Sequence, residues 1–376
     1  MRTAAESTQP AAVVDCRIAI VSDSMPERNG VGAYYADLMR HIGDQVGGIE
    51  LLCPEDESLG FFTMPLIGDS TQKLTYPVPQ KLYRRLRDFD PHVVIVPTPG
   101  PFGVLGAIFG RRIGARVIAG FHTDYDKMTA LYWGPLIARV CAGYFRFTNK
   151  IIFKRSDLVL GNSPQMLEVA RALGAKRTEL MGTLVARDFL ETPASQQRDP
   201  IRKILFLGRL AAEKNIPDLL NSVEQLPELE FQIAGDGPMR EQVVAKAGVL
   251  PNLNYLGWID RVQARDLIDA SDLLVLPSHT ESFGTVALEA MARQRLVLVS
   301  PNCGIAAWPS LNNALLVMEP GERLADSIRR TIAVEPALRQ TRAVQARKAA
   351  IELNQRSLEA WLRLLNGQKS RVEISG

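Results

Sequence analysis

Short runs of β-branched and aliphatic residues alternate along the chain with longer segments in which apolar residues recur at helical spacing. The runs are continuous, which is typical of strands covered by helices on both faces of a parallel sheet. They form one set in each half of the chain: 17–22, 93–97, 116–121 and 158–161, then 203–208, 231–235, 273–278 and 296–300. This pattern predicts an α/β protein with two doubly wound domains.

A polar segment at 191–203, rich in Pro, Ser and Gln, separates the two sets of runs. It places the domain boundary near residue 200. We therefore expect a loose leader at 1–14, a first domain at 15–195 and a second domain at 200–355. Two parallel-sheet domains leave a cleft between the carboxyl ends of their strands, and this is where ligands of such folds bind.

The composition of the chain excludes several classes of protein. The chain has 376 residues, of which 46% are hydrophobic and 23% charged, and this excludes disorder and a disulfide-rich scaffold. The net charge of +3 gives no reason to expect a nucleic-acid partner. Four cysteines without CxxC spacing fit a reducing cytoplasm. The longest uncharged stretch, at 93–110, is broken by prolines and glycines, so we expect no membrane-spanning segment.

Two candidate site elements follow strands of the first domain. Gly30, Val31 and Gly32 lie where a helix begins, so backbone N–H groups there can bind an anion, although a plain turn explains the pattern equally well. His122 ends a strand and is expected to face the cleft, the alternative being a buried core histidine. Asp124 and Asp126 form a DxD pattern that we interpret as loop polarity, so no metal site is predicted. The motif GxGxxG is absent, which counts against a dinucleotide-binding protein.

The second domain carries the stronger candidates. Arg209 and Lys214 follow Gly208 at a strand end and can clamp a diphosphate, the alternative being a solvated helix start. Gly235 and Asp236 come before a helix expected to begin at Pro238, and they can also line a nucleotide pocket.

The densest pattern of the second domain is ESFGTVALEAMA. Its two carboxylates, Glu281 and Glu289, can accept hydrogen bonds from sugar hydroxyls. The loop between them offers amide donors to phosphate, at Phe283, Gly284 and Thr285. The alternative is a surface helix with two unrelated glutamates, but the flanking residues are nearly all apolar or small.

These motifs together resemble the retaining glycosyltransferases of the GT-B fold, glycosyltransferase family 4. The E-x7-E pattern is Glu281 to Glu289 and the GR-x4-K element is Gly208 to Lys214. The stretches AGDGP, LGWI and NGV also occur in family order, and the resemblance covers residues 17–365.

The resemblance implies two Rossmann-like domains, an acceptor domain at 15–195 and a sugar-nucleotide domain at 200–355, with a final helix at 356–376 that crosses back to the first domain. It implies that Arg209 and Lys214 hold the donor diphosphate and that the Gly30 loop covers it. Glu289 would bind the ribose, while Glu281, His122 and the backbone at 283–285 would meet the donor sugar. The expected donor is a UDP- or GDP-hexose, with no cofactor and no metal.

A further resemblance concerns the acceptor. The stretches TPGPFG (98–103) and GFHTD (120–124) look like those of enzymes that glycosylate diacylglycerol or phosphatidylinositol. Independently, segment 111–155 holds nine basic residues against two acidic ones, interleaved with aromatic and aliphatic residues. This composition suits an anionic membrane surface. The chain is therefore expected at the cytoplasmic face of the membrane in glycolipid biosynthesis, unless the segment is a core-packed helix pair with a basic solvent face.

One segment departs from the family pattern. EAMA is followed by Arg293-Gln294-Arg295-Leu296 where a small-Gly-x-Pro turn is usual. The next loop, SPNCGIAA (300–307), has one glycine where a pair is usual, and Trp308 follows it. The alternatives are therefore a sugar-nucleotide-binding protein that has lost turnover and, as a second enzyme class, a GT-B sugar-nucleotide epimerase.

Overall fold

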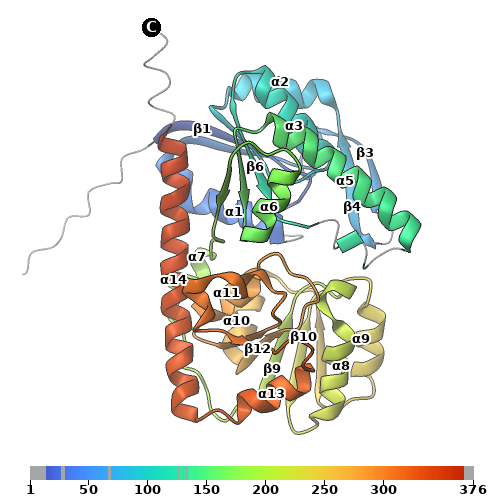
Figure 1. Ribbon diagram of the computed structural model, residues 1–376, viewed down its shortest axis with the longest axis vertical. Coiled ribbons are helices and arrows are strands. Elements are labelled where there is room, and N and C mark those ends of the chain that lie inside the picture. The colour runs from blue at the N-terminus through green and yellow to red at the C-terminus, as the bar shows by residue number, and fades with distance from the viewer. Residues whose placement is uncertain are drawn as a thin grey trace, which may run out of the picture.

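The computed structural model describes residues 14–26, 30–66, 69–124, 128–129, 131 and 134–367. In it the chain forms two α/β domains, one above the other, with the long helix α14 (Pro336–Asn366) running along both (Figure 1). Each domain is built on a six-stranded sheet in which every pairing is parallel. This confirms the predicted fold class.

The N-terminal sheet has the order β2-β1-β5-β6-β7-β8. Its strands are β1 (Val14–Val21), β2 (Val46–Leu52), β5 (Val93–Val96), β6 (Arg116–Phe121), β7 (Leu158–Gly161) and β8 (Thr178–Leu180). The helices around it are α1 (Gly30–Ile42), α2 (Pro79–Phe89), α3 (Pro101–Arg112), α5 (Pro135–Arg155) and α6 (Pro164–Ala172). The short helix α7 (Arg187–Glu191) contacts α1 of this domain and α10 and α11 of the other, and its Phe189 is buried in the C-terminal core. Strands β5 and β7 are buried along their whole length, as continuous apolar runs require.

The C-terminal sheet has the order β11-β10-β9-β12-β13-β14. Its strands are β9 (Lys203–Leu207), β10 (Glu230–Ala234), β11 (Leu253–Gly257), β12 (Leu273–Leu276), β13 (Leu296–Val299) and β14 (Leu316–Val317). Its helices, apart from α14, are α8 (Ile216–Gln225), α9 (Arg240–Ala247), α10 (Arg261–Ala270), α11 (Thr285–Ala292), α12 (Pro309–Asn312) and α13 (Leu324–Ile332). One large apolar core fills the space between these helices and the sheet.

The strands that the apolar pattern did not predict lie at the edges of the sheets or outside them. β2 and β11 are edge strands that are buried over only part of their length, and they contain glycines, so they lack a continuous apolar run. An antiparallel hairpin, β3 (Gly60–Leu66) and β4 (Asp69–Pro77), projects from the N-terminal domain and was not predicted either (Figure 1).

Helix α14 joins the two domains. It packs on α11 in the C-terminal domain, and its last turns enter the N-terminal core, where Trp361 and Leu365 are fully buried. There the Trp361 indole N–H donates to the Tyr34 hydroxyl at 2.8 Å. The sequence placed the start of this helix at 356, whereas α14 begins at Pro336. The segment 192–202, which contains most of the expected linker, has neither helix nor strand.

Some sequence predictions fall outside the described residues: the leader at 1–13, Asn29 of the NGVG stretch, Asp126 of the DxD pattern, and Lys127, Tyr132 and Trp133 of the basic segment. Among the helices that are described, none has the length and apolar character needed to cross a membrane.

Candidate active site

The GR-x4-K and E-x7-E elements meet at the carboxyl ends of β9 and β12. The short helix Ala212–Lys214 follows β9, and its Lys214 ammonium contacts the carboxylate of Glu281, which lies in the loop before α11. Both side chains are less than one-fifth exposed. Burial acts to lower the pKa of Lys214, but attraction to the Glu281 carboxylate and the hydrogen bond that the ammonium donates to it outweigh burial, so that the pKa is raised. Lys214 is therefore a cation at neutral pH.

Arg209 lies on the loop after β9, supported by the end of β10. Burial acts to lower its pKa, and the nearby Glu213 carboxylate opposes this. Gly235 adopts φ +137°, and a Cβ there would lie 1.8 Å from the carbonyl oxygen of Gly208, so only glycine lets the two strand ends pack. Asp236 accepts the Leu210 N–H on its backbone at 3.0 Å and the Gly237 N–H on its carboxylate at 2.8 Å. Gly235 and Asp236 thus support the Arg209 loop, and the expected helix begins at Arg240 rather than at Pro238.

The ESFG loop is fastened to the segment 300–304. The Gly304 N–H donates to the Glu281 carbonyl at 2.8 Å, and the Cys303 thiol lies 3.4 Å from the Phe283 carbonyl. Gly284 adopts φ +95° immediately before α11, which begins at Thr285. The Phe283 side chain is buried, so only its backbone is available to a ligand. These contacts hold the start of α11, where N–H groups can bind phosphate.

The arginines that depart from the family pattern hold the linker in place. Arg293 is fully buried, pairs with Asp269 at 2.6 Å, and donates to the carbonyls of Phe189, Thr192 and Pro193. Arg295 donates to the carbonyls of residues 195, 196 and 269. Their hydrogen bonds therefore fasten the segment between the domains, and neither arginine is paired with Lys214, Glu281 or Glu289.

Glu289 projects from the second turn of α11 and is 13% exposed at its side chain. Burial raises its pKa to about 7, while the Arg261 guanidinium, 3.8 Å away, acts to lower it and the Asp37 carboxylate acts to raise it. Arg261 opens α10, and it pairs through both terminal nitrogens with Asp37 of α1, which belongs to the other domain. The predicted ribose carboxylate therefore lies beside a contact between the two domains.

His122 follows β6 and lies among polar partners rather than in a purely apolar core. Its Nε2 is hydrogen-bonded to the Tyr35 hydroxyl at 2.9 Å, and the Asn162 side chain also hydrogen-bonds to it. A Cβ on Gly120 would lie 2.3 Å from that hydroxyl, so glycine makes room for the contact. Burial lowers the pKa of His122 to about 4, although the Asn162 bond opposes this, so the imidazole is neutral at physiological pH.

Trp308 connects the strand end near His122 to the ESFG loop of the other domain. Its indole N–H donates to the backbone carbonyl of Asn162 at 2.8 Å, and its ring packs edge-on against Phe283, with centroids 6.0 Å apart. Since Asn162 also hydrogen-bonds to His122, this contact brings the candidate residues of both domains to one cleft.

The glycines at the start of α1 differ in what surrounds them. A Cβ on Gly32 would lie 1.9 Å from the Met25 carbonyl oxygen, which explains a glycine there by close backbone packing. Gly30 has open space around its Cβ position, and Val31 is partly exposed. The first turn of α1 carries no acidic residue, so its N–H groups stay suited to an anion.

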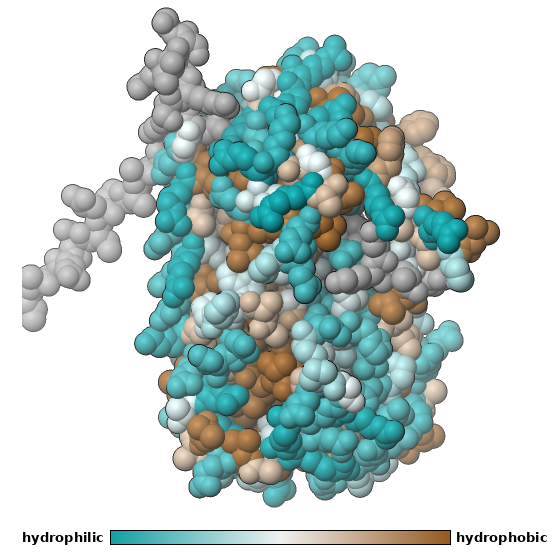
Figure 2. Space-filling view, in the orientation of Figure 1, coloured by the Kyte–Doolittle hydropathy of each residue, from teal (hydrophilic) through white to brown (hydrophobic). Residues whose placement is uncertain are grey.

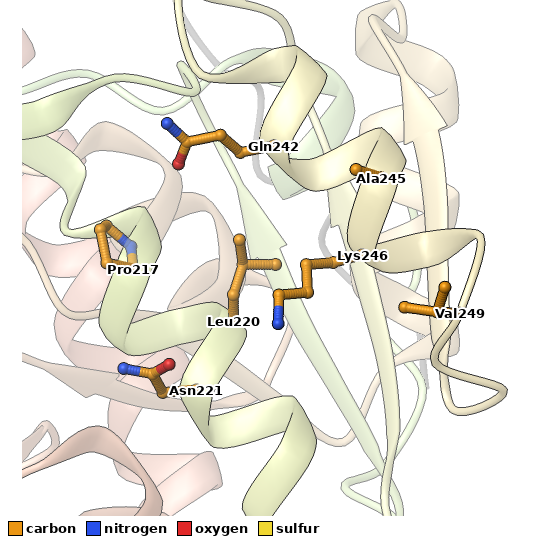
Figure 3. Close-up of a pocket in the computed structure, with 7 residues that line it drawn as sticks. All are labelled: Pro217, Leu220, Asn221, Gln242, Ala245, Lys246 and Val249. Carbon is orange, nitrogen blue, oxygen red and sulfur yellow. The ribbon is translucent and has the colours of Figure 1, made fainter.

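Across the part of the chain that is described, no three His, Cys, Asp or Glu side chains are grouped so as to hold a metal ion. A hollow of about 470 Å³ lies away from the cleft, between α8 and α9 (Figure 3), and is lined by residues that include Leu220 and Lys246. Nothing in its lining matches the candidate chemistry, so we do not include it in the site.

Three residues of the cleft were absent from the sequence candidates: Asp37, Arg261 and Trp308. The position of Arg261 at the start of a helix could be recognised in the sequence, because Asp260 and Gln263 form a capping box that fixes the start of α10. Its partner Asp37 had none, since the two residues are 224 positions apart and meet only in the folded chain.

Comparison with known families divides the chain into two halves. Residues 28–181 match the family described as Glycosyltransferase Family 4, and residues 190–349 match the family described as Glycosyl transferases group 1. The two matches meet at the linker between the sheets and together span most of the chain.

Characterised proteins with similar sequences carry the names of sugar transferases. The GDP-mannose-dependent alpha-mannosyltransferase of Mycobacterium tuberculosis is 25% identical over 314 residues, 77% of this chain and 79% of that protein. The alpha-D-kanosaminyltransferase of Streptomyces kanamyceticus is 26% identical over 64% of this chain and 67% of its own length. The sulfoquinovosyl transferase of Arabidopsis thaliana is 23% identical over 71% of this chain and 55% of its own length.

Solved structures show the same fold. The sucrose-phosphate synthase of Thermosynechococcus elongatus superimposes with a TM-score of 0.66 at 19% identity, covering 95% of this chain and all of that one. The Anabaena protein HepE in complex with UDP-glucose superimposes with a TM-score of 0.67 at 16% identity, covering 93% of this chain and all of that one. The fold and the two family matches agree, and the chain belongs to the GT-B glycosyltransferases, with a family 4 N-terminal half and a group 1 C-terminal half.

Proposed function

We propose that the protein is a retaining glycosyltransferase that moves a hexose-type sugar from UDP or GDP to an acceptor hydroxyl. The observation that carries the proposal is the contact of Lys214 with Glu281, because it joins a predicted diphosphate ligand to a predicted sugar ligand in one place. The names of two relatives, a GDP-mannose-dependent enzyme and a protein bound to UDP-glucose, support both guanosine and uridine as the nucleoside of the donor.

The proposed chemistry relies on charge and positioning. As the C1–O bond to the β-phosphate breaks, Arg209 and Lys214 stabilise the charge that develops on the departing diphosphate. The acceptor oxygen forms its bond to C1 on the same face of the sugar, and its proton passes to the departing phosphate. Glu289 accepts hydrogen bonds from the ribose, and neutral His122 hydrogen-bonds a sugar hydroxyl. Two protein cations supply the charge that the diphosphate needs, so we propose that transfer requires no metal ion.

We propose a membrane lipid as the acceptor, on the evidence of helix α5. One face of this helix packs on the domain through Ala142, Thr148 and Ile152. The opposite face presents an apolar stripe whose members are between 41% and 75% exposed: Leu136, Val140, Tyr144 and Phe147. An apolar stripe that faces away from its own core is unusual for a surface helix and typical of one that meets another apolar phase.

Charge and neighbouring aromatic residues extend this surface. Helix α5 carries no acidic residue and five cations, all of them exposed: Arg139, Arg146, Lys150, Lys154 and Arg155. Exposed Phe61 and Phe62 of β3 and Tyr76 of β4 continue the apolar surface. Figure 2 shows hydrophobic side chains gathered on the side of the N-terminal domain where Figure 1 places the hairpin and one end of α5. Anionic lipid headgroups complement both features.

The basic segment 111–155 is not uniform, and part of its sequence interpretation needs correction. Arg111 pairs with Asp157 at 2.9 Å, and Arg116 donates to the Leu364 carbonyl of α14 at 2.7 Å. Ile152 and Phe153 are buried in the core, as the alternative interpretation expected. The surface proposed to meet the membrane is therefore the exposed face of α5 together with the hairpin.

The proposal is tested by nucleotide binding followed by transfer. We expect UDP or GDP to raise the melting temperature of the protein equally with and without EDTA, by mass action on the folded state. Glu281→Gln should abolish transfer from the corresponding hexose donor to diacylglycerol or phosphatidylinositol in vesicles. Nucleotide binding should persist, because Lys214 and Arg209 remain.

The outcomes of this test separate the alternatives. Binding without transfer to any lipid, glycan or small-molecule hydroxyl would indicate a sugar-nucleotide-binding protein. Interconversion of the donor sugar without an acceptor would indicate an epimerase. Loss of stabilisation in EDTA would refute the metal-independent mechanism.

A further inference from the structure

A cluster of charged side chains links the two domains beside Glu289. Asp37 of α1 has a side chain only 1% exposed, and its two oxygens receive both terminal nitrogens of Arg261. Arg40, on the same helix, approaches Asp37 at 3.4 Å from a largely exposed position. Arg261 also lies 3.8 Å from the Glu289 carboxylate, and Asp188 of α7 acts on it electrostatically. One guanidinium is thus shared by carboxylates of both domains.

The geometry places Arg261 between two competing partners. The capping box formed by Asp260 and Gln263 fixes the first turn of α10 and hence the base of the Arg261 side chain. With the domains as they are seen here, Asp37 takes the bidentate pair and Glu289 is left beyond hydrogen-bond distance of the guanidinium. If the domains separate, α1 carries Asp37 away, whereas Glu289, 3.8 Å from the guanidinium, belongs to the same domain as Arg261 and stays beside it.

We propose that Arg261 is a positioning residue that couples closure of the interdomain cleft to the availability of Glu289. In the open form Arg261 pairs with Glu289 and masks it. In the closed form Asp37 draws Arg261 away, and the Glu289 carboxylate can accept hydrogen bonds from a ribose. The inference rests on the proposed function only for the identity of the ligand, a nucleoside diphosphate.

The two partners of Arg261 should therefore respond differently to substitution. Asp37→Asn leaves Arg261 to mask Glu289 in every state, so we expect UDP or GDP to bind about fivefold more weakly, or worse, at pH 8. Arg261→Gln removes the mask together with the bridge, so the loss at pH 8 should be smaller. The decisive variant is the double substitution, in which the loss caused by Asp37→Asn should be largely rescued by Arg261→Gln.

The pH dependence of nucleotide binding is a second measurement, and an ion pair with a merely structural role would not change it. Arg261 acts to lower the pKa of Glu289, and Asp37 acts to raise it. The pH at which affinity rises should therefore shift upward in Arg261→Gln and downward in Asp37→Asn. Titration of the nucleotide's own phosphate is common to all variants and cancels in the comparison.

The experiment is calorimetric titration of wild type, both single variants and the double variant with UDP and GDP between pH 5.5 and 8.5. Arg265→Gln is the matched control, since Arg265 lies one turn further along α10 and pairs with the exposed Asp266. Rescue in the double variant and opposite pH shifts support the proposal. A double variant as weak as Asp37→Asn, or shifts of the same sign, would overturn it.

A wild type that binds neither nucleotide would contradict the proposed function and still leave this inference testable. In that case the melting temperature of the ligand-free proteins is measured against pH, because it also reports the titration of Glu289. Opposite shifts of its inflection in the two single variants would then support the charge coupling, and identical curves would refute it.

Discussion

Replacing Glu289 with glutamine should stabilise the fold at alkaline pH while impairing the site. The pKa of this carboxyl is raised to about 7 from an ordinary value of 4.5, chiefly by burial. Between these values the folded chain binds more protons than the unfolded chain, so stability falls as pH rises. With about 1.4 kcal/mol for each pH unit, the ionised carboxylate costs the folded state about 3 kcal/mol at pH 8. Glutamine does not ionise and escapes this cost.

The assay is the melting temperature of wild type and Glu289→Gln between pH 4.5 and 8.5. The melting temperatures of the two proteins should nearly coincide at pH 4.5, where the folded carboxyl is protonated and the unfolded one is only half ionised. Their difference should grow to roughly 6–12 °C at pH 8, taking about 2–4 °C for each kcal/mol in a unit of 150–250 residues. Nucleoside diphosphate binding should weaken in the same variant, a trade of stability for function that active sites commonly show.

The chain supplies a control of opposite sign. The pKa of Glu322 is lowered to about 2, chiefly by the hydrogen bonds that its carboxylate accepts from Arg330. Glu322→Gln should therefore lower the melting temperature at pH 8, and its melting temperature should converge with that of wild type in acid. A difference between Glu289→Gln and wild type that is the same at pH 5 and pH 8 would refute the reasoning. So would a variant that melts lower than wild type at pH 8.

Three further predictions concern other parts of the molecule. Because the pKa of His122 is lowered to about 4, its contribution to stability is complete above pH 6.5 and is lost as the pH falls toward 4. The NMR resonances of its imidazole ring should therefore stay constant from pH 6 to 8. A titration midpoint near pH 6.5 would contradict this prediction. Trp361→Ala should cost about 3–5 kcal/mol in urea unfolding because the ring is fully buried, whereas Trp258→Ala, at a 60% exposed position, should cost little. Phe147→Asp should reduce sedimentation with phosphatidylglycerol vesicles roughly tenfold or more, while Val249→Asp on the other domain should not, and equal effects would exclude α5 as the contact.

The sequence alone determined the fold class and the candidate residues at the strand ends. Buried parallel strands need continuous apolar runs, and glycines and cations directly after such runs mark the carboxyl edge of a sheet, as at Gly208 and Arg209. These signals depend only on neighbouring residues, so they can be recognised in the sequence. Edge strands such as β2 give a weaker signal because only part of their surface is buried.

The tertiary structure decided which of those residues act together. Lys214 and Glu281 are 67 positions apart, and Arg261 and Asp37 are 224 apart, so no spacing rule connects them. The structure also gave Arg293 a purely structural partner in Asp269, where the departure from the family pattern had raised doubts about the donor site. Apolar periodicity specifies which face of an element is buried, but the pairing of charges across a cleft depends on how two separately folded sheets dock, and only the folded chain contains that information.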